Sequence, residues 1–210
     1  MMEKPLRFLA LGDSYTIGTG LDSGKNWPIQ LAESLRNQGF TIEAPLIIAH
    51  NGWTTRDLLA AIEDTAPQGS FDLVTLLIGV NNQYQSQDIE TYRQEFRTLL
   101  RLAIDFGGGN PAKAVVFSIP DWSVTPFAQG RDRAQISNQI DQFNAVNLAE
   151  SQAAGVDYFD ITHISRQAAN DDSLLASDSL HPSEKMYAAW IDLILPQVTE
   201  NLCSDLKQVQ

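Results

Sequence analysis

The fold is decided by a stretch near the start of the chain, Leu6-Arg7-Phe8-Leu9-Ala10-Leu11-Gly12-Asp13-Ser14-Tyr15. Its apolar part has the length of a strand and is too short to cross a membrane. The strand pattern ends abruptly in Gly-Asp-Ser, which predicts a sharp turn. Open parallel sheets gather their ligands at the carboxyl ends of their strands, so we expect Ser14 to face a substrate. Gly, Asp and Ser are also ordinary turn residues, and the rest of the chain must decide between the two interpretations.

The composition is typical of a soluble globular protein with a single domain spanning residues 1–210. Of the 210 residues, 43% are hydrophobic and 19% are charged. The net charge of -12 argues against a nucleic-acid partner and against an anionic membrane, because both require a clustered basic surface. Cys203 is the single cysteine, which excludes an intramolecular disulfide and a cysteine metal cluster. We expect no metal site.

The first residues do not show the pattern of a secretory signal, and no apolar stretch approaches the length of a membrane span. We therefore expect a cytoplasmic protein, although a leader could have been trimmed. The sequence gives no indication of the oligomeric state, so a monomer is the default expectation.

Strand and helix patterns alternate along the chain. Strands are expected within residues 6–11, 40–49, 73–78, 114–119 and 156–160. Helices are expected at residues 27–35, 54–65, 90–107, 132–154 and 163–170 and in a last segment capped by Ser183. Pro45 makes the second strand an edge strand or a bulged one. Such alternation predicts an α/β protein with three α/β/α layers around a flavodoxin-like, five-stranded parallel sheet.

The turns after the first three strands carry Ser14, Gly52 and Asn81, which meet at one rim of this sheet. A serine that attacks an acyl carbon needs hydrogen-bond donors around the developing oxyanion. The backbone N–H groups of Ser14 and Gly52 and the carboxamide of Asn81 would supply three donors. Each residue type is common in turns, so it is their combination that points to catalysis.

A general base is also needed, because an unassisted serine hydroxyl is a poor nucleophile near neutral pH. The candidates are His50, His163 and His181. Two of them follow an aspartate by three residues, Asp160 before His163 and Asp178 before His181, and this spacing alone does not choose between them. The context favours His181, because its segment is irregular and polar and is followed by the last helix. Asp160 instead continues out of the fifth strand.

Four segments resemble, in order, the sequence blocks of the SGNH hydrolases, the GDSL-type esterase and lipase family: Gly12-Asp13-Ser14, Asn51-Gly52, Gly79-Val80-Asn81 and Asp178-Ser179-Leu180-His181-Pro182. The resemblance implies that Ser14 is the nucleophile, His181 the base and Asp178 its orienting carboxylate. It also implies that Ser14, Gly52 and Asn81 form the oxyanion hole. Family members have a three-layer α/β/α fold and generally need no cofactor. The expected activity is the hydrolysis of carboxylic esters of small or short acyl groups through an acyl-enzyme.

Two positions depart from the family pattern. Tyr15 stands where the family name has leucine, which is expected to alter packing and the pocket wall. Asn82 follows Asn81 where the pattern has aspartate, so a neutral amide replaces a carboxylate near the site. We interpret Asp13 as a structural residue of the turn rather than as a participant in the chemistry.

Four aromatic residues on the predicted loops at this rim are candidates for substrate binding: Trp53, Tyr84, Trp122 and Phe127. Aromatic side chains in loops also pack against the core. The expected partner is a small-molecule ester. The sequence does not separate an acetylated sugar from an aryl ester, a lysophospholipid or a thioester.

Two other functions fit part of the sequence. The segment from Ser14 to Gly20 has the composition of a loop that binds phosphate or flavin in flavodoxin-like proteins, where backbone N–H groups face the anion. That function gives no role to Asp178 and His181. A catalytically inactive family member that serves as a binding module is the other alternative, which the departure at Asn82 encourages.

Overall fold

Five parallel strands form the central sheet of the computed structural model, which describes residues 4–208. The strands are β1 (Phe8–Gly12), β2 (Leu46–Ala49), β3 (Leu73–Leu77), β4 (Ala114–Phe117) and β5 (Asp157–Phe159). Their order is β2-β1-β3-β4-β5, which is the flavodoxin-like order of doubly wound sheets. Every residue of β1, β3 and β4 is buried, which explains why these segments are apolar runs without alternation. The predicted fold class is confirmed.

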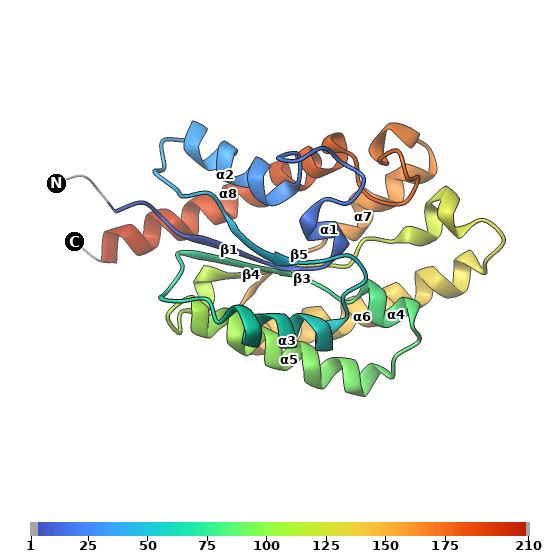
Figure 1. The fold of residues 1–210 in the computed structure, drawn as a ribbon, viewed down its shortest axis with the longest axis horizontal. Coiled ribbons are helices and arrows are strands. Elements are labelled where there is room, and N and C mark those ends of the chain that lie inside the picture. The colour runs from blue at the N-terminus through green and yellow to red at the C-terminus, as the bar shows by residue number, and fades with distance from the viewer. Residues whose placement is uncertain (1–3, 209–210) are drawn as a thin grey trace.

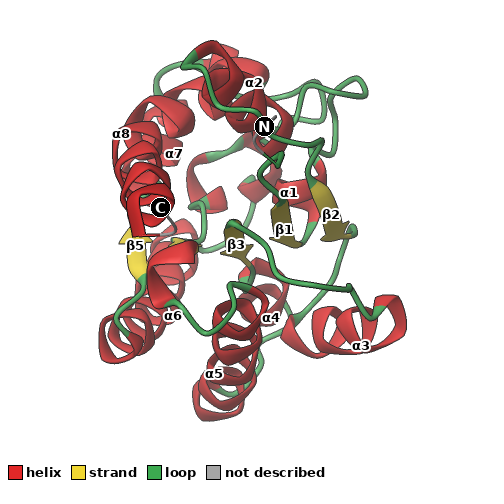
Figure 2. Cartoon of the chain, turned by 90° about the vertical axis from the view of Figure 1, so that its left-hand side faces the viewer, coloured by secondary structure: helices red, strands yellow, loops and turns green. Residues whose placement is uncertain are grey.

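Helices cover both faces of the sheet (Figures 1 and 2). One face carries α1 (Ser14–Ile17), α2 (Trp27–Asn37), α7 (Thr162–Ser165) and α8 (Glu184–Gln208). The other carries α3 (Thr55–Thr65), α4 (Val80–Tyr84), α5 (Ile89–Phe106) and α6 (Arg133–Ala154). Within the first layer α2 packs against α8, and each helix contributes a fully buried tryptophan, Trp27 and Trp190. This apolar packing holds the strands as a rigid base for the loops at their carboxyl ends.

Two glycines shape the strand-end turns beneath the site. A Cβ on Gly12 would lie 2.5 Å from the backbone oxygen of Leu77 and closer still to the side chain of Thr16. Gly79 has a φ of 129°, and a Cβ there would lie 2.7 Å from Cδ1 of Ile119. Side chains larger than hydrogen are therefore excluded where β1 and β3 end, so the chain can turn tightly at both points.

The expected elements match the structure closely, with several differences. Ser14 and Asn81, which are expected in turns, lie on the short helices α1 and α4. β2 is an edge strand as predicted, but it begins at Leu46 because Pro45 has no N–H to donate to a neighbouring strand. Upstream of it, Ile42 forms an isolated bridge to Leu6. The helix expected at residues 163–170 is α7 followed by a short 3₁₀ helix, Arg166–Ala169. No helix of the described residues is long and apolar enough to cross a membrane.

Candidate active site

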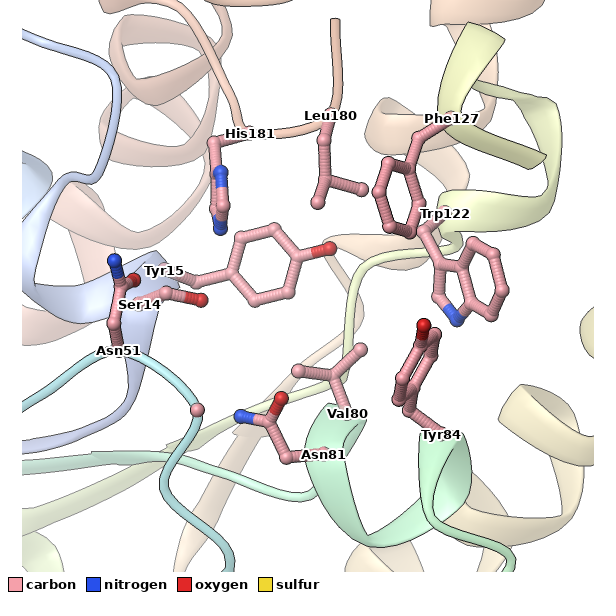
Figure 3. A pocket seen from close by; sticks show the side chains of 11 residues that line it. Ser14, Tyr15, Asn51, Val80, Asn81, Tyr84, Trp122, Phe127, Leu180 and His181 are labelled. Atoms are coloured by element: carbon pink, nitrogen blue, oxygen red, sulfur yellow. The ribbon is translucent and has the colours of Figure 1, made fainter. Parts of the chain in front are cut away.

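A cavity of about 270 Å³ opens at the carboxyl edge of the sheet, where the turns after β1, β2 and β3 meet (Figure 3). Eleven residues line it: Ser14, Tyr15, Asn51, Gly52, Val80, Asn81, Tyr84, Trp122, Phe127, Leu180 and His181. The structure thus brings together segments that lie far apart in the sequence. Open α/β sheets bind their ligands in a crevice of this kind.

Ser14 is the first residue of α1, directly after the turn at the end of β1. The carboxylate of Asp13 caps this helix by accepting a hydrogen bond of 3.0 Å from the backbone N–H of Tyr15. At the other end of the helix, the N–H groups of Gly18 and Thr19 donate to the backbone oxygen of Ser14. Burial raises the pKa of Asp13 to about 7, against two opposing backbone hydrogen bonds. These contacts fix the backbone of Ser14 in the tight turn, as the sequence predicts for Asp13.

His181 and Asp178 form a hydrogen-bonded pair next to the cavity. Nδ1 of His181 lies 2.6 Å from Oδ2 of Asp178. The other carboxylate oxygen accepts the backbone N–H groups of Leu180 and His181 at 3.0 and 2.9 Å. Burial opposes ionisation of Asp178, but the hydrogen bonds from His181 and Leu180 outweigh it, so the pKa of this carboxyl lies below its ordinary value. Figure 3 shows the imidazole of His181 extending from its loop toward the Ser14 hydroxyl.

The two other histidines do not reach the cavity. Nδ1 of His163 lies 3.9 Å from Asp160, and both side chains are more than half exposed, at 57% and 61%. His50 points its Nδ1 at the backbone oxygen of Asn51, 3.0 Å away, and its ring packs against Trp53. The two Asp-x-x-His segments are alike in spacing, yet His181 is the histidine that lines the cavity with Ser14.

Ser14, Gly52 and Asn81, which line the cavity from three turns, each carry a hydrogen-bond donor. The N–H of Ser14 belongs to the first turn of a helix, where backbone N–H groups have no partner within the helix. The N–H of Gly52 donates to no acceptor among the described residues, and its φ of 79° favours glycine. Asn81 uses one of its two amide hydrogens to hold the backbone oxygen of Trp53 at 2.9 Å, and the second has no acceptor among the residues that the structure describes. A further bond, from the hydroxyl of Thr19 to Oδ1 of Asn51, ties the loops together at 2.5 Å.

The departure from the family pattern at Asn82 has a structural explanation. The side chain of Asn82 is fully buried, and its Oδ1 accepts the backbone N–H of Thr55 at 3.1 Å. Its amide donates to the hydroxyl of Thr55 and to Oε1 of Gln87. Oε2 of Glu95 in turn accepts from the Thr55 hydroxyl and from Nε2 of Gln87, at 2.5 and 3.1 Å. Glu95 is the one carboxylate of this network and can only accept hydrogen bonds. The neutral amide of Asn82 therefore supplies the donors for the Thr55 hydroxyl and for Oε1 of Gln87, which a second carboxylate could not do.

The aromatic candidates divide into two groups. Tyr84, Trp122 and Phe127 line the cavity and pack against one another, with ring centroids 5.6 to 6.5 Å apart. The guanidinium of Arg131 lies 5.1 to 5.4 Å from the three ring centroids and donates to the Tyr84 hydroxyl. Trp53 does not line the cavity. Its indole packs against His50 and the core, and its backbone oxygen holds Asn81 instead.

Three lining residues lie outside the sequence-based set: Asn51, Val80 and Leu180. Each is the neighbour in sequence of a predicted site residue, because tight turns bring consecutive side chains to the same rim. Tyr15 also lines the cavity, in agreement with the expected change of the pocket wall. Adjacency to Gly52, Asn81 and His181 is the signal that would have found the three missing residues.

Three solved structures with the same fold are distant in sequence. TesA superposes with a TM-score of 0.71 at 18% identity, over 93% of this chain and 99% of TesA. A lipase/acylhydrolase from Enterococcus faecalis gives 0.69 at 20% identity, covering 95% and 96%. A single-residue variant of Axe2, an acetyl-xylooligosaccharide esterase from Geobacillus, gives 0.71 at 18% identity, covering 94% and 96%. A search of curated proteins returned no match to this sequence.

The sequence pattern that defines one enzyme family covers most of the chain. It matches residues 10–189, from within β1 to within α8, and so includes all the turns that line the cavity. The fold, the cavity at the carboxyl edge of the sheet and this match agree with one another. The chain belongs to the GDSL-like lipase/acylhydrolase family.

Proposed function

We propose that this protein hydrolyses carboxylic esters of small or short acyl groups, with Ser14 as nucleophile, His181 as general base and Asp178 as the residue that orients His181. The observation that carries the proposal is the bond of 2.6 Å between Asp178 and His181, at the wall of the cavity that Ser14 also lines. A carboxylate can only accept hydrogen bonds, so this contact places a proton on Nδ1 of His181. Nε2 is then the nitrogen that takes the serine proton.

The reaction would run in two halves. The Ser14 oxygen attacks the ester carbon while its proton moves to Nε2 of His181, and the tetrahedral intermediate then expels the alcohol, which takes that proton. Water attacks the resulting acyl-enzyme by the same route, and it releases the acid and restores the serine hydroxyl. Asp178 stays ionised throughout and stabilises the imidazolium, in keeping with its lowered pKa.

The oxyanion would be held by the backbone N–H groups of Ser14 and Gly52 and the carboxamide of Asn81. All three donors are fixed before substrate arrives, two by tight turns and the third by its bond to the oxygen of Trp53. Donors that are already in place cost no rearrangement when charge develops on the oxygen. This preorganisation is the main source of rate enhancement in the proposal.

The size and lining of the cavity support a compact substrate. A volume of about 270 Å³ lies just below the usual range for small-molecule pockets, which begins at about 300 Å³. Tyr84, Trp122, Phe127 and Val80 make the side of the cavity away from Ser14 largely apolar. A structural neighbour that acts on an acetylated substrate, the Axe2 esterase, is consistent with a short acyl group.

Two measurements on purified protein test the proposal. Hydrolysis of p-nitrophenyl esters of increasing acyl length should be fastest for the shortest chains, and Ser14→Ala should abolish it. Diethyl p-nitrophenyl phosphate should add a diethylphosphoryl group to Ser14, seen by mass spectrometry of the intact chain and its peptides. Full esterase activity in Ser14→Ala, or labelling at another residue, would refute the assignment of Ser14.

A further inference from the structure

Tyr15 occupies an unusual place in the cavity wall. It follows Ser14 directly, is 3% exposed, and contacts the imidazole of His181 edge to face with ring centroids 5.4 Å apart. Its backbone oxygen accepts a hydrogen bond of 2.8 Å from the hydroxyl of Tyr187 in α8. Both the backbone and the ring are therefore held in place by neighbours within the protein, and their position does not depend on a bound ligand.

The hydroxyl of Tyr15 has no hydrogen-bond partner among the described residues, although the side chain is almost completely buried. Figure 3 shows it at the far end of the ring from Ser14, pointing into the cavity toward Leu180 and Trp122. Burial raises the pKa of this phenol above its ordinary value, and the charges of Asp13, Asp121 and Asp178 add to the effect. The group therefore stays protonated and can donate. The Tyr15 hydroxyl is not among the enclosed polar atoms that lack a partner, so it opens onto the cavity, where an acceptor atom of a ligand can take the place of water.

Most neighbouring groups on this side of the cavity are apolar or already hydrogen-bonded. Val80 and Leu180 are apolar. The indole N–H of Trp122 donates to Oε1 of Gln83 at 2.8 Å, and the hydroxyl of Tyr84 accepts from Arg131 at 3.0 Å. The polar groups of the proposed chemistry lie at the other end of the Tyr15 ring. A donor surrounded by apolar surface selects strongly for a matching acceptor, because an unpaired polar group there is unfavourable for binding.

We propose that the Tyr15 hydroxyl donates a hydrogen bond to an oxygen atom on the arm of the ester, acyl or alcohol, that occupies this cavity. The enzyme then prefers esters whose arm carries an ether, hydroxyl or carbonyl oxygen over esters with a plain hydrocarbon arm. This inference rests on the proposed esterase function. It makes Tyr15 a specificity-determining residue in addition to the residues that carry out the chemistry.

The test compares substrates in which one methylene is replaced by an ether oxygen. For the acyl arm these are p-nitrophenyl methoxyacetate against butyrate, and 3-methoxypropanoate against pentanoate. For the alcohol arm the pair is 2-methoxyethyl acetate against butyl acetate. The readout is the ratio of kcat/KM for the oxygen-containing ester to that for its hydrocarbon partner. Dividing the ratio for the wild type by the ratio for Tyr15→Phe cancels the different intrinsic reactivities of the esters.

We expect this double ratio to be about three to ten for at least one pair, which is the usual loss for one neutral hydrogen bond. Tyr15→Phe keeps the ring and its contact with His181. Tyr15→Leu, which restores the residue of the family pattern, should lose the preference as well. Tyr158→Phe is the matched control, because it removes a tyrosine hydroxyl that donates to the backbone oxygen of Asn144 outside this cavity, and its double ratio should be about one.

A double ratio near one for all pairs in both Tyr15 variants would overturn the inference, and so would an equal effect of Tyr158→Phe. Either result leaves the proposed esterase function standing, provided that the wild type cleaves the hydrocarbon esters and Ser14→Ala does not. If the wild type cleaves none of the esters, the proposed function itself fails. The two failures are therefore distinguishable in one set of assays.

Discussion

The carboxylate of Asp178 binds both the backbone and the side chain of His181. Oδ1 accepts the backbone N–H of His181 at 2.9 Å, and Oδ2 lies 2.6 Å from Nδ1 of its imidazole. One turn of the chain therefore fixes the position of the ring, its rotation and the nitrogen that carries the proton. Ser179, between the two residues, has a φ of 59°, in the left-handed region that few side chains adopt. Strain of this kind persists where the surrounding structure holds it, as it does beside this cavity.

Asp178→Asn should lower kcat by about a thousandfold or more for a short ester. The amide that replaces the carboxylate can donate to Nδ1, which would move the imidazole proton to Nε2 and remove the base. Thermal unfolding of the variant should stay close to that of the wild type, because the site is near the surface. The measurement is steady-state kinetics with p-nitrophenyl acetate.

Asp160→Asn is the matched control, because Asp160 also precedes a histidine by three residues but stands 3.9 Å from it on an exposed surface. This variant should retain most of the wild-type kcat. Equal losses in Asp178→Asn and Asp160→Asn would contradict the assignment of the pair.

Asn81→Ala should lower kcat by a factor of about 100 to 1,000 while KM changes little, because the lost donor acts on charge that develops in the transition state. Trp53→Phe is the control. Asn81 is held by the backbone oxygen of Trp53, not by its indole, so the phenylalanine variant should keep most of the activity. A loss in Trp53→Phe as large as that in Asn81→Ala would show that the indole, and not the carboxamide, controls turnover.

Much of the fold can be predicted because the signals are local. The buried strands β1, β3 and β4 are apolar runs bounded by turn residues, and α3 begins at the predicted place, where Thr54 and Asp57 form a capping box. The start of β2 is less well predicted. Hydrophobicity extends upstream of Pro45, but strand pairing depends on a backbone N–H that proline lacks.

The sequence identifies residues that line the cavity when their place in a turn decides where they lie. It does not identify those whose direction depends on packing against distant parts of the chain. Ser14, Gly52 and Asn81 follow strand ends closely, and the structure brings all three to the cavity. Trp53 also follows such a turn, but its indole packs against His50 and the core, a direction set by neighbours distant in sequence. Glu95 lies on α5, where nothing in the sequence connects it with the network of Asn82.

The network around Asn82 predicts a compensating pair of substitutions. Asn82→Asp should lower the free energy of unfolding by about 1 to 3 kcal/mol, because it places a second carboxylate near Glu95 and removes the donor to the Thr55 hydroxyl. Adding Glu95→Gln should recover much of this loss, since the glutamine amide supplies a donor again. Urea unfolding of the wild type, both single variants and the double variant measures the coupling. Strictly additive effects would show that the two side chains do not share a network.

The raised pKa of Asp13 predicts how the free energy of unfolding changes with pH. Its folded pKa of about 7 lies above the ordinary value of 3.8, so the folded protein binds this proton more tightly than the unfolded chain does. The stabilisation that the proton on Asp13 provides is therefore complete below about pH 4 and is lost as the pH rises through 7. Over this range the free energy of unfolding should fall by at most about 1.4 kcal/mol per pH unit from this group. Asp13→Asn keeps the oxygen that accepts from Tyr15 but does not titrate, so this part of the slope should disappear. Urea unfolding of the wild type and variant at several pH values between 4 and 7 measures it.

The control for Asp13 is Asp88→Asn, at the exposed N-cap of α5. Hydrogen bonds from the backbone and side chain of Thr91 lower the pKa of Asp88, so its contribution is present above its ordinary pKa and is lost only as the pH falls below that value. Asp88→Asn should therefore leave the slope between pH 4 and 7 as it is in the wild type. If Asp13→Asn also left the slope unchanged, Asp13 would be ionised in the folded protein across this range, and its unpartnered Oδ2 would need a proton donor that the described residues do not provide.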